Sequence, residues 1–207
     1  MQALLGGITE SRQDFIPLPG VAIEVADIHQ QIPGEVLMNQ QFTTATLQKQ
    51  VQTNPFPIVH LATHGQFGSD AESTFILTWD DRLHAKQLGD LLRQRQQGDR
   101  HPIELLVLSA CQTARGDTRA ALGLAGLAVR SGARSTLAAL WSVDDQATTR
   151  LMTRFYQELL KPGVTKAEAL RRAQLSLLQG EDGSENQAPE FAHPYYWAAF
   201  VLVGDWL

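Results

Sequence analysis

The segment Ile103–Asp117, "IELLVLSACQTARGD", starts as a run of aliphatic residues and then changes to small and polar ones. Its apolar part, "IELLVLSA", predicts a strand, because short continuous apolar runs are typical of strands buried on both faces. The strand would end beside Cys111, which is the only cysteine among the 207 residues. The segment therefore predicts a buried strand, with a potentially reactive side chain at its carboxyl end.

Strands and helices are expected to alternate along the rest of the chain. Residues 3–8, 35–38, 56–65, 103–110, 135–143 and 195–207 read as strands, whereas 21–32, 44–52, 85–96, 121–133, 145–160 and 165–179 read as helices. A hairpin with Asp80 and Asp81 near its turn precedes the third helix. Because parallel strands need crossover connections that are usually helices, the pattern predicts an α/β fold with a mainly parallel central sheet covered on both faces.

Composition excludes several classes of protein. Apolar residues make up 43% of the chain and charged residues 19%, and the net charge of −5 gives no general electrostatic reason to bind nucleic acid or an anionic membrane. A single cysteine cannot form an intramolecular disulfide, so we expect a cytoplasmic protein. The sequence has neither a signal-peptide pattern nor a long apolar run. It begins directly with a strand, which suggests a domain of a longer chain.

Cys111 could be a nucleophile or a small buried apolar residue, and the surrounding sequence bears on this choice. Only a few per cent of an unperturbed thiol is ionised at neutral pH, so a reactive cysteine needs a neighbouring base. His64 follows another apolar run and precedes Cys111 by 47 positions (111 minus 64). This spacing is similar to that in caspases, whose histidine lies about 50 residues before the cysteine. We therefore expect His64 and Cys111 to meet where two strands end.

Four motifs extend this comparison over nearly the whole chain. They are "IVHLATHG" (58–65), "LLVLSACQTARGD" (105–117), "ALGLAGLAVRSGARSTLAALWSVDD" (121–145) and "HPYYWAAFVLVGDW" (193–206). In this order and at these distances they resemble the CHAT domain family, caspase-like domains that often follow tetratricopeptide repeats and are related to separase. The resemblance implies a caspase–hemoglobinase fold, a three-layer αβα sandwich, formed by one domain over residues 1–207. It also implies a tetratricopeptide repeat region or regulatory protein as a partner, and no cofactor.

The same resemblance implies a cysteine endopeptidase. His64 would be the general acid and base, Cys111 the nucleophile, and the backbone amides of Gly65 and Cys111 would form the oxyanion hole. In separase-like enzymes an acidic residue after the tryptophan receives a basic side chain of the substrate. In "WSVDD" this acid would be Asp145 or, as the second choice, Asp144, so we expect cleavage after Arg or Lys.

Other interpretations of these residues stay open. Asp144 and Asp145 could act at the start of a helix, where acids cap free N–H groups and interact favourably with the helix dipole. His60 and His64 would suggest a metal site on a helix, but on a strand they stand roughly 13 Å apart, so we expect no metal and a core or edge histidine at position 60. The glycine-rich segment after Cys111 lacks a phosphate-binding pattern. The domain could also be a non-proteolytic scaffold or a latent enzyme gated by residues 66–72 and 181–193.

Overall fold

The computed structural model describes residues 1–66, 72–97, 101–109, 125–180 and 189–207. Their centre is a six-stranded sheet with the strand order β2-β1-β3-β7-β8-β9. The strands are β1 (Ala3–Gly7), β2 (Gly34–Met38), β3 (Ile58–Ala62), β7 (Leu105–Leu108), β8 (Ser135–Ala139) and β9 (Phe200–Gly204). The first five are parallel to their neighbours, and only β9 runs antiparallel, next to β8. The mainly parallel sheet predicted from the alternating pattern is confirmed.

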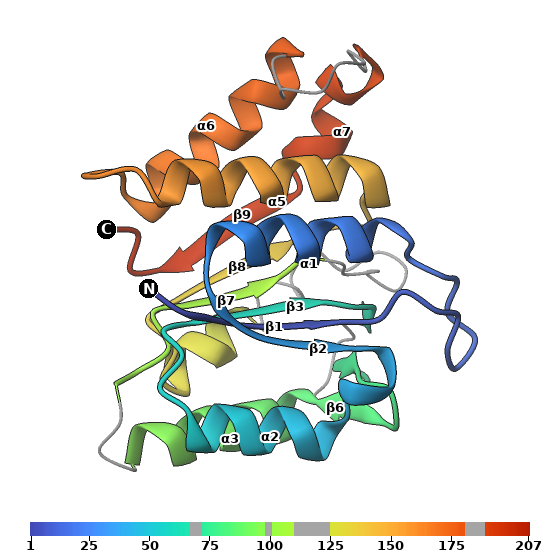
Figure 1. Cartoon of the computed structure of the whole chain (residues 1–207), viewed down its shortest axis with the longest axis vertical. Coiled ribbons are helices and arrows are strands. Elements are labelled where there is room, and N and C mark those ends of the chain that lie inside the picture. Colours follow the sequence, from blue (N-terminus) through green and yellow to red (C-terminus); the bar gives the residue numbers. More distant parts are fainter. Residues whose placement is uncertain (67–71, 98–100, 110–124, 181–188) are drawn as a thin grey trace.

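Helices cover both faces of this sheet (Figure 1). On one face lie α1 (Gly20–Gln31), α5 (Asp145–Leu159), α6 (Lys166–Gln179) and the short α7 (Pro194–Trp197); on the other lie α2 (Thr44–Thr53) and α3 (Ala85–Gln97). Because both faces are covered, every residue of β1, β3, β7 and β8 is buried. The expected three-layer arrangement is thus confirmed. None of the described helices is long and apolar enough to cross a membrane.

A second, smaller sheet positions the end of β3. It contains β4 (Gly65–Gln66), β5 (Phe75–Leu77) and β6 (Arg82–His84), all antiparallel, in that order. Its β5–β6 hairpin, with the predicted turn, leads directly into α3. Strand β4 was not expected as a separate element, because the sequence pattern assigns Gly65 to the end of the preceding strand. Two residues separate β3 from β4, and the second of them is His64.

Side-chain caps fix where several helices begin. The hydroxyl of Thr43 accepts a hydrogen bond from the N–H of Thr46 at the start of α2, and that of Thr165 accepts one from the N–H of Glu168 at the start of α6. Two short 3-10 helices, η1 (Asn39–Gln41) and η2 (Pro189–Ala192), complete the described elements. The helix expected at residues 121–133 is described from residue 125, and its backbone is helical to residue 130.

The prediction of one continuous last strand over residues 195–207 is wrong in its first part. Residues Pro194–Trp197 form a helical turn, and the strand begins only at Phe200. The His193 side chain accepts a hydrogen bond from the N–H of Tyr195, and Pro194 occupies the first turn, where its missing N–H costs nothing. Local capping therefore overrides the strand preference of the aromatic residues.

Candidate active site

His64 lies at the carboxyl end of β3, where the main sheet passes into the small one. The Leu77 N–H donates a hydrogen bond to the His64 carbonyl oxygen at 2.8 Å, and the Thr63 hydroxyl donates one to the Leu77 carbonyl oxygen at 2.9 Å. The β5 strand therefore holds the histidine backbone from one side. Gly65, which follows, is buried and is the first residue of β4. As in other parallel sheets, the carboxyl ends of the strands form the edge at which ligands bind.

Two consecutive residues of one loop hold the imidazole ring. This loop, residues 9–19 between β1 and α1, is called the strap below. The Nε2 atom of His64 lies 2.7 Å from the Ile16 carbonyl oxygen, and the Phe15 ring stacks on the imidazole with the ring centroids 4.8 Å apart. A carbonyl can only accept a hydrogen bond, so Nε2 carries the hydrogen. In the neutral ring Nδ1 is then the basic nitrogen.

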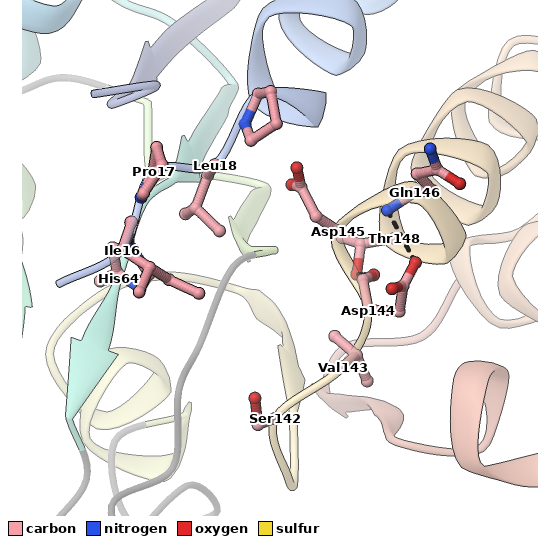
Figure 2. Close-up of a pocket in the computed structure, with 11 residues that line it drawn as sticks. Ile16, Pro17, Leu18, His64, Ser142, Val143, Asp144, Asp145, Gln146 and Thr148 are labelled. Atoms are coloured by element: carbon pink, nitrogen blue, oxygen red, sulfur yellow. Dashed lines mark hydrogen bonds between the residues drawn. The ribbon is translucent and has the colours of Figure 1, made fainter. Parts of the chain in front are cut away.

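His64 also lines a cavity of about 410 Å³. The strap residues Ile16, Pro17, Leu18 and Pro19 form one wall, and the segment that leads from β8 into α5 forms the other, with Ser142, Val143, Asp144, Asp145, Gln146 and Thr148. Figure 2 shows His64 beside the strap and the two aspartates across the cavity. The structure thus brings together three predicted site residues that come from distant parts of the sequence: His64, Asp144 and Asp145.

Asp145 connects this cavity to the start of α1. Its Oδ2 atom accepts a hydrogen bond of 2.5 Å from the Gly20 N–H, and the Thr149 hydroxyl donates a bond of 3.1 Å to the Gly20 carbonyl oxygen. A side chain at position 20 would collide with the carboxylate, since its Cβ would lie 2.7 Å from Oδ2. Glycine therefore allows the amino end of α1 to approach α5 closely.

Asp144 has a different structural role, as the capping residue of α5. Its Oδ1 atom accepts hydrogen bonds from the N–H groups of Gln146, at 2.9 Å, and Ala147, at 3.0 Å. The helix-start interpretation of the two acids is therefore confirmed for Asp144, while Asp145 serves the start of a different helix, α1. Both carboxylates line the cavity in addition to making these bonds.

Burial and charge shift the pKa values of His64 and Asp145 in opposite directions. Burial lowers the pKa of His64 below its ordinary value, although the Ile16 carbonyl and the Asp145 charge oppose this change. Burial raises the pKa of Asp145, assisted by the charges of Glu24 and Asp144 and opposed by the Gly20 N–H and by His64. A lowered histidine pKa favours the neutral imidazole, which is the form that can accept a proton.

His60 is a buried core histidine, as predicted. Its Nε2 atom lies 2.8 Å from the Glu24 carboxylate and 3.2 Å from the Ser109 hydroxyl, and its Nδ1 atom lies 3.1 Å from the Tyr156 hydroxyl. His60 and Glu24 are completely buried. From the middle of β3, His60 thus joins α1, α5 and the end of β7 through hydrogen bonds. Its partner Glu24 belongs to no motif and lies 36 positions away in the chain, so it could not be found from the sequence.

Cys111 and most of the two gating segments, residues 66–72 and 181–193, lie outside the described residues. The dyad with His64 and the oxyanion hole formed by Gly65 and Cys111 therefore stay predictions. The contribution of the strap was missed by the sequence analysis, because Phe15 and Ile16 lie in an irregular segment without a motif. Residues 17–19, just before α1, contain two prolines, which are typical of a loop and indicate no site.

Comparison with known proteins supports the same family that the motifs indicated. The sequence profile of the CHAT domain family matches residues 3–205. Tetratricopeptide repeat protein 28 of Mus musculus is 35% identical over 110 residues, and that of Homo sapiens is 30% identical over 106 residues. Each match covers 50% of this chain and 4% of the relative, so the chain corresponds to a small part of those proteins.

The fold is similar to that in the complex of the pro- and mature domains of Porphyromonas gingivalis RgpB. The TM-score is 0.61 over 99% of this chain and 47% of that chain, at 9% sequence identity. At this identity the likeness establishes the fold alone, and it agrees with the caspase-like architecture that the motifs implied. The profile match over almost the entire chain shows that this protein belongs to the CHAT domain family, which is related to the caspase-like cysteine peptidases.

Proposed function

We propose that this domain is a cysteine endopeptidase that cleaves after a basic residue, with His64 and Cys111 as its catalytic dyad. The observation that carries the proposal is the cavity that His64 shares with Asp144 and Asp145. A candidate base and two candidate specificity acids, about 80 positions apart in the sequence (145 minus 64 is 81), thus face one space.

In the proposed reaction His64 acts through Nδ1, the nitrogen that is unprotonated in the neutral ring when Nε2–H is bonded to Ile16. It takes the proton of the Cys111 thiol, and the thiolate attacks the substrate carbonyl carbon while the Gly65 and Cys111 amides stabilise the oxyanion. The protonated imidazole then gives its proton to the departing amine. Water, activated by the same nitrogen, hydrolyses the thioester and restores the free thiol.

The two walls of the cavity match the two parts of an arginine side chain. Ile16 and Leu18 of the strap can cover the methylene groups, and the carboxylates of the opposite wall can bind the guanidinium. A planar guanidinium forms two parallel bonds with one carboxylate, which an ammonium cannot do, so we expect Arg to be preferred over Lys. An acidic substrate residue would be repelled.

Covalent labelling provides the first test, using an acyloxymethylketone peptide with Arg at the reactive end. Because the chain contains a single cysteine, any thiol adduct reports on Cys111 alone. We expect one adduct on the unmodified chain, none on Cys111→Ala, and a strongly reduced rate for His64→Ala. Turnover of an Arg peptide by the Cys111→Ala variant would end the proposal.

The two aspartates are separated by isosteric substitutions. Asn caps helices as well as Asp does, so Asp144→Asn removes a charge and retains the α5 cap, and Asp145→Asn retains an oxygen for the Gly20 N–H. Loss of one charge-assisted bond of about 1.5–3 kcal/mol predicts a fall in kcat/KM of roughly 10- to 150-fold for the acid that binds Arg. Preferred cleavage after Asp in a peptide library would refute the specificity.

A non-proteolytic scaffold is the second candidate, and one observation favours it. Both aspartates already accept hydrogen bonds from backbone N–H groups, so each has a structural role that needs no substrate. Inertness of Cys111 toward Arg, Lys and Asp probes would support this alternative. Since the curated relatives are tetratricopeptide repeat proteins, we further propose that such a repeat region regulates the domain in the cytoplasm, and the labelling is best repeated with that region present.

A further inference from the structure

The strap that holds His64 has little burial of its own. Between Thr9 and Pro19 each residue is exposed or half-buried, and Ile16 is 66% exposed although its carbonyl oxygen binds the imidazole. Segments with few buried contacts open at low free-energy cost. Contacts from outside the strap must therefore determine how firmly Phe15 and Ile16 stay on the ring.

The turn at the tip of the strap is conformationally strained. Arg12 and Phe15 exchange both backbone hydrogen bonds, at 3.2 and 2.9 Å, so the two residues between them form a tight turn. Those residues, Gln13 and Asp14, have φ values of 46° and 68°, in the left-handed region that glycine, asparagine and aspartate adopt more readily than other residues, so the strain lies mainly at Gln13. The strap does not adopt this shape by local preference, which again requires an outside anchor.

Arg12 supplies this anchor by binding the β5–β6 turn. Its Nε atom donates a hydrogen bond of 2.8 Å to the Trp79 carbonyl oxygen, and its guanidinium carbon lies 4.3 Å from the centre of the Trp79 ring. From the hairpin side, the Arg82 Nε donates a bond of 3.0 Å to the Gln13 side chain. We call the pair of Arg12 and Trp79 the latch.

The same hairpin also holds the backbone of His64. Strand β5 pairs with β4, and the Leu77 N–H binds the His64 carbonyl oxygen, only two residues before Trp79. One rigid element thus fixes the histidine backbone directly and the imidazole indirectly, through Arg12, the strap and Ile16. Phe75 of the hairpin adds an edge-on contact to Phe15, with the ring centroids 6.3 Å apart.

We propose that Arg12 is a positioning residue that, through the latch, keeps the strap closed on His64 and so fixes the orientation and tautomer of the catalytic base. This inference rests on the proposed function of His64. It also assigns a control point, since a partner that binds the latch and separates Arg12 from Trp79 would release the imidazole. Arg12 and Trp79 are not among the residues that line the cavity; the latch reaches the cavity only through Ile16 of the strap.

The test compares Arg12→Ala and Arg12→Lys with the unmodified 207-residue chain. Arg150→Ala serves as a matched control, because the Arg150 guanidinium likewise lies over an aromatic ring, 5.0 Å from the centre of the Phe191 ring in η2. NMR titration measures the pKa of the His64 imidazole, with its signal assigned by its loss in His64→Gln. Thermal unfolding confirms that each variant is folded.

Opening of the strap changes the pKa of His64 in a predictable direction. Burial, the largest effect on this pKa, lowers it, and the Ile16 bond only partly opposes that change. Arg12→Ala should therefore raise the pKa of His64 toward the ordinary value of 6.5. Arg12→Lys keeps a cation over the Trp79 ring, so it should leave this pKa near that of the unmodified chain, and Arg150→Ala should do the same. A misplaced base should also reduce kcat for an Arg peptide, by roughly up to 100-fold.

An unchanged His64 pKa in folded Arg12→Ala would overturn the proposal. If Arg12→Ala does not fold, Trp79→Leu removes the ring contact of the latch and leaves the carbonyl oxygen of residue 79 in place, so the His64 pKa should rise in the same direction but by less. Because the NMR titration does not depend on proteolysis, it can refute the positioning role of Arg12 independently of the peptidase function. Absence of both labelling and turnover, with the repeat region present as well, together with a raised His64 pKa in Arg12→Ala, would refute the peptidase function and still support the role of the latch.

Discussion

Replacement of Glu24 provides the most direct test of how the core beneath the cavity is held together. The Glu24 and His60 side chains have no exposed surface, and Glu24 Oε1 accepts a hydrogen bond of 2.8 Å from His60 Nε2. The other carboxylate oxygen, Oε2, is buried without a hydrogen-bond partner in the described part of the chain. Burial of the carboxylate is therefore compensated at only one of its two oxygens, and the pair stabilises the fold less than it would with both oxygens bonded.

Two substitutions at this position separate the bond from the charge. Glu24→Ala removes the acceptor and leaves His60 Nε2 with only the Ser109 hydroxyl, at 3.2 Å, so we expect a loss of about 3–5 kcal/mol, as for other broken buried pairs. Glu24→Gln keeps the volume and one oxygen acceptor, and its amide replaces the unpartnered oxygen, so the expected loss is about 1 kcal/mol.

Urea unfolding measures both changes, with exposed Glu35→Ala as a control that should stay within about 0.5 kcal/mol of the unmodified chain. In thermal unfolding the Glu24→Ala loss corresponds to roughly 6–20 °C for a domain of this size. Equal losses for the Ala and Gln variants would refute the reasoning, because they would show that His60 needs the negative charge itself. Losses below about 1 kcal/mol for both would show that the buried bond contributes little.

Two further predictions concern pH and glycine. Burial raises the pKa of Glu158, but hydrogen bonds from Lys161 and Arg172 outweigh this effect and keep the pKa below 4.5. The stability that the ionised carboxylate provides is therefore present above about pH 4.5, and it is lost as the pH falls through the pKa of Glu158 in the folded chain. Urea midpoints should therefore fall more steeply with acid in the unmodified chain than in Glu158→Gln, and parallel curves would contradict this. Gly34→Ala places a Cβ inside the β1 backbone and should cost at least about 1–3 kcal/mol, because a backbone cannot move aside as a side chain can. Gly180→Ala, at φ 68° with open space around it, should cost only about 1–2 kcal/mol. If urea unfolding showed a larger loss for Gly180→Ala than for Gly34→Ala, strain in φ would outweigh the overlap with the β1 backbone.

Much of the fold was predictable because its signals are local. Continuous apolar runs marked the buried strands, and two helix starts rest on equally local contacts, since the hydroxyls of Thr43 and Thr165 accept hydrogen bonds from N–H groups three residues later. The helical turn at Pro194–Trp197 was missed, since aromatic residues fit a strand pattern equally well and a single histidine cap decided between the two. The separate β4 was missed because its two residues carry no periodicity.

The sequence by itself determined the family, the mainly parallel sheet and the candidate residues His64, Asp144 and Asp145, since each belongs to a motif of contiguous residues. Only the tertiary structure decided what surrounds them. It placed the strap on the imidazole, bonded the Asp145 carboxylate to the first residue of α1, and joined Glu24 to His60 across 36 positions. Such contacts depend on how strands and helices pack, and a bond between distant residues leaves no periodic pattern in the chain that a single sequence can show.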